Sequence, residues 1–151
     1  MKILVLNGSP KRDKSDTMHI AHAFLEGMKE AASQDMHIIH TIDHHIEYCT
    51  GCFSCMRNGG TCVHDDDMRE ILEEILASDL LIWSFPLYCY GMPASLKALL
   101  DRTLPLSSMA MQKIGEPPPL CRRIRPWYLS SDGYSRGSPW NRHAFRACPF
   151  R

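Results

Sequence analysis

The first seventeen residues constrain the fold more than any other part of the chain. Residues 3–6 read Ile-Leu-Val-Leu, a short apolar run without polar alternation, which is typical of a parallel strand covered on both faces. Residues 7–10 include Asn, Gly and Pro, which end a strand. Residues 15–17, Ser-Asp-Thr, can each cap the free amides at the start of a helix. The pattern therefore predicts a central parallel strand, a loop and a helix.

The loop between this strand and this helix has the composition of an anion site. The predicted helix directs its N-terminal amides and the positive end of its dipole at the loop. Hydroxyl and cationic side chains converge there: Ser9, Lys11, Arg12, Ser15 and Thr17. The spacing matches neither a Walker A loop nor a Gly-x-Gly-x-x-Gly fingerprint. A phosphate site is one interpretation, and a turn that uses Gly, Ser and Pro for its geometry alone is the other.

Hydrophobic periodicity extends the same alternation along the chain. Apolar residues at helical spacing predict helices over residues 17–33, from 68 to about 76 and over 94–104, and residues 37–42 and 80–85 read as strands. Asp65–Asp67 stand at the start of the second helix, where we interpret them as caps. Three β–α repeats in 151 residues predict one α/β domain, a doubly wound parallel sheet in three α/β/α layers.

A second loop, after the strand at 80–85, is suited to a planar ligand. In a sheet of strand order 2-1-3 it faces the first loop across the ligand crevice. Two prolines stiffen it, its aromatic side chains offer flat faces, and its glycine admits close approach of the backbone. The residues that we expect to line a ring and its side chain are Pro86, Leu87, Tyr88, Tyr90, Gly91 and Met92.

Four cysteines form a third candidate site between the other two. Cys49, Cys52 and Cys55 are each separated by two residues, and Cys62 follows six residues after Cys55. Structural zinc sites usually place two close pairs on separate knuckles, whereas this compact run suits the corners of a [4Fe–4S] cluster. Thiols that only shape a loop are the equal alternative.

Because no apolar run is long enough for a membrane span or a signal peptide, we expect a cytoplasmic protein with reduced cysteines.

These motifs together resemble the NAD(P)H-dependent FMN reductase family, which has a flavodoxin-like fold. The likeness rests on Asn-Gly-Ser-Pro-Lys-Arg at residues 7–12 with Ser15 and Thr17, and on Pro-Leu-Tyr at 86–88 with Gly-Met-Pro-Ala at 91–94. It covers about residues 1–112. The cysteine run, followed by Asp-Asp-Met at 66–68, is similar to that of the iron–sulfur flavoproteins. One departure is Asp16, a carboxylate where many relatives have Asn.

The resemblance implies an FMN-dependent oxidoreductase that passes electrons from NAD(P)H to a flavin, a quinone or a similar small acceptor. FMN would carry the chemistry, so no catalytic side chain is assigned. An iron–sulfur flavoprotein acting as an electron carrier is the first alternative. A zinc-clasped or cofactor-free binding protein with an inactive C-terminus is the alternative from another class. Family relatives are commonly dimers or tetramers, so we expect a homo-oligomer, with no membrane or nucleic-acid partner.

The C-terminal part differs sharply from the rest of the chain. The chain has no net charge, yet residues 1–112 carry a net charge of −6 and residues 113–151 one of +6. We therefore distinguish a flavodoxin-like FMN-binding domain at 1–112 from an atypical Pro/Arg-rich segment of the same domain at 113–151. Only residues 127–129, Trp-Tyr-Leu, read as a further short strand. We interpret the fold as truncated or altered after the third β–α unit, rather than extended by an RNA-binding segment, which would carry a recognition motif.

Overall fold

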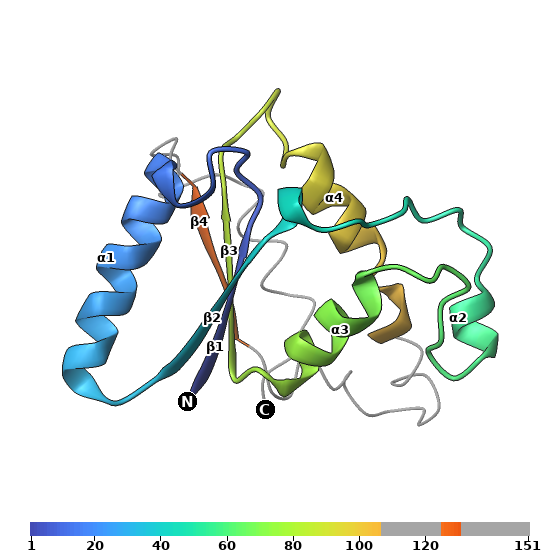
Figure 1. The fold of residues 1–151 in the computed structure, drawn as a ribbon, viewed down its shortest axis with the longest axis horizontal. Helices are drawn as coiled ribbons and strands as arrows, with labels where there is room; N and C mark the ends of the chain where they lie inside the picture. The colour runs from blue at the N-terminus through green and yellow to red at the C-terminus, as the bar shows by residue number, and fades with distance from the viewer. Residues whose placement is uncertain (107–124, 131–151) are drawn as a thin grey trace.

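A parallel sheet of four strands forms the middle layer of the protein. The computed structural model describes residues 1–106 and 125–130. Its strands are β1 (Lys2–Asn7), β2 (Asp35–His40), β3 (Leu80–Phe85) and β4 (Arg125–Ser130), in the spatial order β2-β1-β3-β4. All three neighbouring pairs are parallel. The predicted flavodoxin-like α/β fold with strand order 2-1-3 is confirmed, and β4 extends it beyond β3 (Figure 1).

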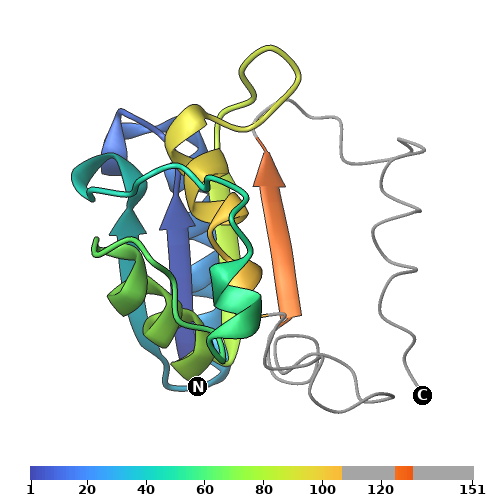
Figure 2. The ribbon, with the colours of Figure 1, turned by 90° about the vertical axis from the view of Figure 1, so that its right-hand side faces the viewer.

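Helices cover both faces of this sheet. Helix α1 (Asp16–Ala31) packs on one face, and α3 (Met68–Ala77) and α4 (Ala94–Asp101) pack on the other. In Figure 2, α3 and α4 lie in front of the strands and α1 lies behind them. A short helix, α2 (Ser54–Arg57), stands apart from the sheet, and two 3₁₀ turns, η1 (Arg12–Lys14) and η2 (Thr41–Asp43), follow the ends of β1 and β2. The result is the expected three-layer arrangement.

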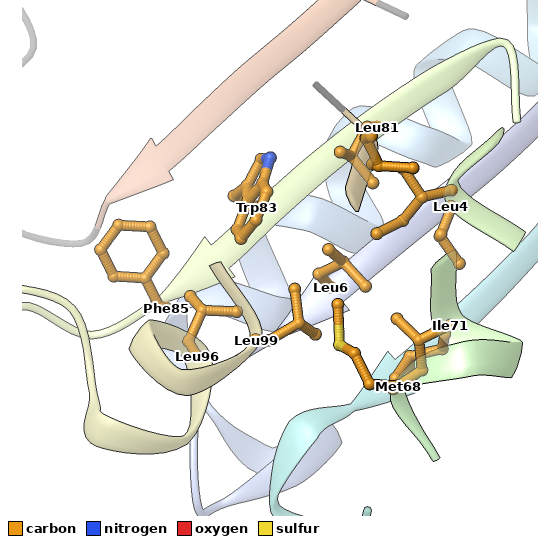
Figure 3. Packing of buried hydrophobic residues seen from close by; sticks show 12 residues of the cluster. Leu4, Leu6, Met68, Ile71, Leu81, Trp83, Phe85, Leu96 and Leu99 are labelled. Carbon is orange, nitrogen blue, oxygen red and sulfur yellow. The ribbon is translucent and has the colours of Figure 1, made fainter. Parts of the chain in front are cut away.

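The alternating sides of β1 and β3 build two separate apolar cores. Leu4 and Leu6 of β1 face α3 and α4, where Met68, Ile71 and Leu99 complete the larger cluster (Figure 3). The opposite side chains of the same strands pack against α1, the helix on the other face. This side consists of Ile3, Val5, Met18, Ala21, Leu25, Leu80 and Ile82. Both central strands are therefore apolar on both faces, as the unbroken runs in the sequence predict.

The predicted bounds of the second strand were wrong by two residues. The sequence suggested residues 37–42, because Ile42 is apolar, but β2 spans Asp35–His40 and Ile42 is 47% exposed in η2. Pairing with β1 decides the register, with Lys2 opposite Asp35 and Asn7 opposite His40. The strand ends where β1 ends, since there is no further backbone to pair with.

Helix α4 also ends earlier than the sequence suggests. The prediction ran to Leu104 and placed Arg102 on the polar side, but α4 ends at Asp101, and Arg102 is only 2% exposed. Tertiary hydrogen bonds hold this arginine in the interior, and helical periodicity cannot reveal them. Buried helical residues Leu96 and Leu99 lie on the predicted inner face.

The predicted short strand at 127–129 is confirmed within the longer β4. Its partners in β3 run from Leu80 opposite Arg125 to Phe85 opposite Ser130. The remainder of the segment 113–151 lies outside the described residues.

Among the residues that the structure describes, no helix is long and apolar enough to cross a bilayer.

Candidate flavin site and cysteine loop

The loop that follows β1 is shaped by a network around Asn7. The Asn7 side chain is fully buried, its Oδ1 accepts the amide of Ser9 at 2.9 Å, and its Nδ2 lies 2.9 Å from Nδ1 of His40. The Thr41 hydroxyl donates to the Asn7 carbonyl at 3.3 Å. Sequence analysis treated Asn7 as a residue that ends the strand and as part of the family motif, and did not foresee these contacts. A polar residue in that position satisfies the backbone of the turn that follows.

Three of the predicted phosphate ligands are buried in this loop and at the helix start that follows it, and two of them are in contact. Ser9, Ser15 and Thr17 are all at least 97% buried, and the hydroxyls of Ser15 and Thr17 lie 3.2 Å apart. Ser15 is the N-cap of α1, where its Oγ accepts the amide of Met18 at 3.3 Å. The first amides of a helix have no partner within that helix. The arrangement therefore combines hydroxyls with a helix N-terminus, the usual elements of an anion site.

Gly8 lets the loop pass close to the next helix. A Cβ atom at this position would lie 2.9 Å from Cβ of Leu96 and 3.2 Å from Cβ of Phe85. The amide of Gly8 donates to the carbonyl of Ser84 at 2.8 Å, so the loop after β1 is fixed directly to the end of β3. Any larger side chain would push α4 away from the loop.

The cationic residues of the loop are arranged differently from the hydroxyls. Lys11 and Arg12 are exposed, and both Nε and Nη2 of Arg12 bond the carboxylate of Asp43. This hydrogen-bonded pair raises the pKa of Arg12 and lowers that of Asp43.

Asp16, the departure from the family pattern, is exposed, whereas its neighbours Ser15 and Thr17 are buried. Its carboxylate therefore lies on the solvent side of the helix start.

The second loop forms a tight turn at the end of β3. The amide of Tyr88 donates to the carbonyl of Gly91 at 2.8 Å, and the amide of Gly91 donates back at 2.9 Å. The two residues between them, Cys89 and Tyr90, have positive φ angles of 47° and 61°. Gly91 does not, so the turn places two side chains, rather than its glycine, in the strained left-handed region.

The predicted ring-lining residues remain open to solvent on this turn. Tyr88 is 50% exposed, Tyr90 is 98% exposed and Leu87 is 38% exposed, whereas Pro86, Gly91 and Met92 are half-buried. Figure 1 shows the turn at the same end of the sheet as the loop after β1. The two predicted ligand loops thus lie at the carboxyl ends of adjacent strands, the usual ligand position in such folds.

A pair of hydroxyls joins the end of β2 to the start of α4 in the same region. The Thr41 hydroxyl lies 2.9 Å from that of Ser95 in the first turn of α4. These two residues line a cavity of about 200 Å³ with Ile42, His44, Ile46, Tyr48 and Ala98. Neither hydroxyl had a recognisable sequence signal, because their meeting depends on how α4 crosses the end of the sheet.

The four predicted metal ligands lie on one long loop after η2. Cys49 and Cys52 are exposed, Cys62 is half-buried and Cys55 is buried at the base of α2. Burial raises the pKa of Cys55, and repulsion from the thiols of Cys62, Cys49 and Cys52 raises it further. Hydrogen bonds from Ser54 lower the pKa of Cys52 to about 7.

These thiols are neighbours without forming a closed ligand set. Within residues 1–106 and 125–130, no group of three or more His, Cys, Asp or Glu side chains is gathered closely enough to hold a metal ion. The donor chemistry of the four thiols suits iron or zinc. The assignment of Cys49, Cys52, Cys55 and Cys62 as ligands stays a prediction.

A buried ion pair, which sequence analysis missed, closes the base of the cysteine loop. Nη1 of Arg102 lies 2.7 Å from Oδ2 of Asp66, and Nη2 lies 3.0 Å from Oδ1. Oδ1 of Asp66 also accepts the amide of Met68 at 3.3 Å, so the predicted capping role is correct for this acid. Asp67 holds the N-cap position of α3, but its side chain makes no capping bond there.

Comparison with known proteins agrees with this architecture. A family model described as a flavodoxin-like fold matches residues 1–107. The chain therefore belongs to the flavodoxin-like family. The match ends at the last described residues of the first segment, just after α4, and contains both predicted ligand loops and the cysteine loop.

Curated relatives include several named iron–sulfur flavoproteins. One from Archaeoglobus fulgidus is 28% identical over 153 residues, which cover 91% of this chain and 68% of that protein. Another, from Methanosarcina thermophila, is 37% identical over 104 residues, which cover 69% of this chain and 53% of that protein. The chain thus spans about half the length of the second relative. The first match, at 91% of the chain, extends beyond residue 112.

Solved structures share the fold at low sequence identity. An FMN-dependent NADH-azoreductase from Bacillus anthracis, in complex with FMN, superposes with a TM-score of 0.61 at 19% identity, covering 97% of this chain and 79% of that one. An NAD(P)H:quinone oxidoreductase from Methanothermobacter marburgensis gives 0.57 at 19% identity, covering 97% and 95%. At this identity the likeness establishes a common fold.

Proposed function

We propose that this protein is an FMN-dependent oxidoreductase that takes electrons from NAD(P)H and passes them to a small acceptor. One observation carries the proposal: the buried hydroxyls of Ser15 and Thr17 lie at the N-terminus of α1, after the loop that holds the buried Ser9, at the same sheet end as the β3 turn. A phosphate at α1 would place the rest of a flavin nucleotide across that end of the sheet.

The side chains of the phosphate loop have distinct roles in this proposal. Hydroxyls of Ser15 and Thr17 would donate to the phosphate, and the exposed Lys11 would supply positive charge. Arg12 would contribute only if it exchanged its partner Asp43 for the phosphate. Asn7 would hold the loop open in the required shape through its bond to the Ser9 amide.

The β3 turn would provide the seat for the flavin ring. Tyr88 and Tyr90 expose aromatic faces beside the half-buried backbone of Gly91 and Met92, and aromatic faces favour stacking on a planar ring. Bound FMN would supply the redox chemistry, an exchange of hydride with the nicotinamide nucleotide. The chain's own residues would bind the flavin and exclude water from it, so no acid or base from the protein is required. A homo-oligomer and a cytoplasmic location remain predictions.

The experiment is a titration of FMN into apoprotein and its Ser15→Ala/Thr17→Ala variant. Because charge-assisted hydrogen bonds contribute about 1.5–3 kcal/mol each, loss of two should weaken FMN binding at least about tenfold. The control is Ser78→Ala, which removes another buried hydroxyl at the opposite end of the sheet, and it should bind FMN as the wild type does. Equal FMN affinity in the double variant and the control would refute the phosphate assignment.

A second candidate, an iron–sulfur flavoprotein, is favoured by the names of the curated relatives and by four cysteines on one loop. We expect anaerobic reconstitution to give about four irons per chain, with ligands Cys49, Cys52, Cys55 and Cys62. Cys52→Ser should lose the iron, whereas Cys89→Ser, on the β3 turn, should retain it. One zinc per chain, or iron content unaffected by Cys52→Ser, would eliminate this candidate.

A further inference from the structure

One buried arginine bonds to both ends of the cysteine loop. The loop, residues 48–65, leaves the fold after Glu47 and returns at Asp66. Nη1 of Arg102 donates to the carbonyl of Glu47 at 2.8 Å and to Asp66 at 2.7 Å. The Glu47 amide also donates to Oδ2 of Asp66 at 2.9 Å. Three groups from separate parts of the chain thus meet at a single point, and the loop is closed there.

This ion pair differs from the others that the structure describes. Its side chains are 2% and 1% exposed, whereas those of the nearby pair Arg69–Asp65 are 65% and 96% exposed. Taking two charges out of water costs several kcal/mol each, and only good geometry with further hydrogen bonds compensates for it. A buried pair is thus weak evidence for net stability, but it fixes the positions of the groups that it joins.

Arg102 also borders a cavity that one of the cysteines lines. Within the described part of the chain, its Nε is buried without a hydrogen-bond partner, and so is Nε2 of His64. Both residues line a cavity of about 280 Å³ that Cys62 also borders. The Cys62 thiol lies near enough to the guanidinium to help Asp66 raise the pKa of Arg102 against the effect of burial. Nη1 and Nη2 of the guanidinium thus hold the loop ends, while the same side chain borders this cavity.

Helix α4 connects this point to the predicted flavin site. Its first turn carries Ser95, bonded to Thr41, and Leu96, packed against Gly8 of the phosphate loop. Arg102 is the C-cap of the same helix. With a rise of about 1.5 Å per residue, the eight residues of α4 span about 12 Å.

We infer that Arg102 and Asp66 form a clasp, a buried ion pair that closes the cysteine loop onto the end of α4, and that Arg102 is a positioning residue for Cys55 and Cys62. The clasp holds Cys55 in the interior and keeps Cys62 beside the guanidinium. The inference rests on the contacts of the loop itself. It is independent of whether the protein binds FMN or iron, and its test requires neither.

The test compares alkylation of individual cysteines by iodoacetamide, followed by peptide mass spectrometry of the full chain. The rate at buried Cys55 is divided by the rate at exposed Cys49 in the same molecules. Arg102→Met/Asp66→Asn removes both charges together, which avoids leaving one buried charge unpaired. We expect the ratio of Cys55 to Cys49 to rise at least tenfold. The matched control, Arg69→Met/Asp65→Asn, removes the exposed pair and should change the ratio less than twofold.

Dilute urea distinguishes loop opening from general loss of stability. Opening of one loop exposes little surface, so the Cys55 rate in the clasp variant should be nearly independent of urea, whereas global unfolding gives a steep dependence. If the double variant does not fold, the same measurement is made on Arg102→Lys. A single ammonium group cannot reproduce the forked contact with Asp66 and Glu47. Arg102→Lys should therefore raise the ratio of the Cys55 rate to the Cys49 rate at least threefold. A wild-type ratio in either folded variant, or a steep urea dependence, would overturn the clasp.

Discussion

At the scale of single residues, the candidate flavin site depends on close packing between the loop backbone and α4 as much as on polar contacts. Asn7 satisfies the loop backbone, and Gly8 leaves no room for a Cβ between the loop and α4. Both stand beside the residues that the sequence marked as ligands. Their roles follow from neighbours distant in sequence, since Leu96 and Phe85 set the space at Gly8 and His40 is the partner of Asn7.

A pair of glycine substitutions tests the close approach at Gly8. Gly8→Ala should lower the free energy of unfolding by about 1–3 kcal/mol, because the added methyl overpacks the contact with Leu96. Gly27→Ala is the matched control: it lies within α1, where no atom of residues 1–106 or 125–130 comes within 4 Å of an added Cβ. It should raise the free energy of unfolding by about 0.5–1 kcal/mol. Urea denaturation measures both. Equal effects of the two substitutions would contradict the packing argument.

At the scale of elements, tertiary pairing determines where strands and helices end. β2 begins two residues before the predicted start because its register follows β1. α4 ends at Asp101, and the next residue turns inwards to form the clasp. The β3 turn accepts positive φ angles at two residues other than glycine, a backbone strain that commonly occurs at binding sites. Of these departures, the early end of β2 and the β3 turn lie at the end of the sheet that carries the candidate site.

At the scale of the whole molecule, β4 protects the sheet. Without it, β3, whose six residues are all buried, would become an edge strand with unpaired backbone groups, and such edges promote association between chains. Residues 125–130 thus cover the outer edge of β3, although they belong to the segment with the atypical composition.

Two shortened chains test the role of β4. A chain that ends at residue 112 lacks β4, so we expect it to self-associate as its concentration increases, whereas a chain that ends at residue 130 retains the strand and should match the full-length protein. Light scattering over a range of concentrations makes the comparison. The same number of chains per particle for both shortened chains and the full chain, at every concentration, would show that β4 is not needed to protect the edge of β3.

The sequence alone determined the class of fold and the location of the candidate site. The unbroken apolar run at residues 3–6 and the run at 80–85, apolar except for Ser84, required a sheet covered on both faces. The polar loops after them then had to meet at one edge. Hydroxyls at Ser15 and Thr17 could be recognised because a helix start follows a fixed local pattern.

Only the tertiary structure decided how these parts are joined. Nothing local in the sequence distinguishes the buried pair Arg102–Asp66 from the exposed pair Arg69–Asp65, since both join common surface residue types. The difference arises because α4 ends beneath the cysteine loop, where the arginine reaches Glu47 and Asp66 at once. Periodicity and spacing describe neighbours along the chain, whereas burial depends on which distant segments pack together.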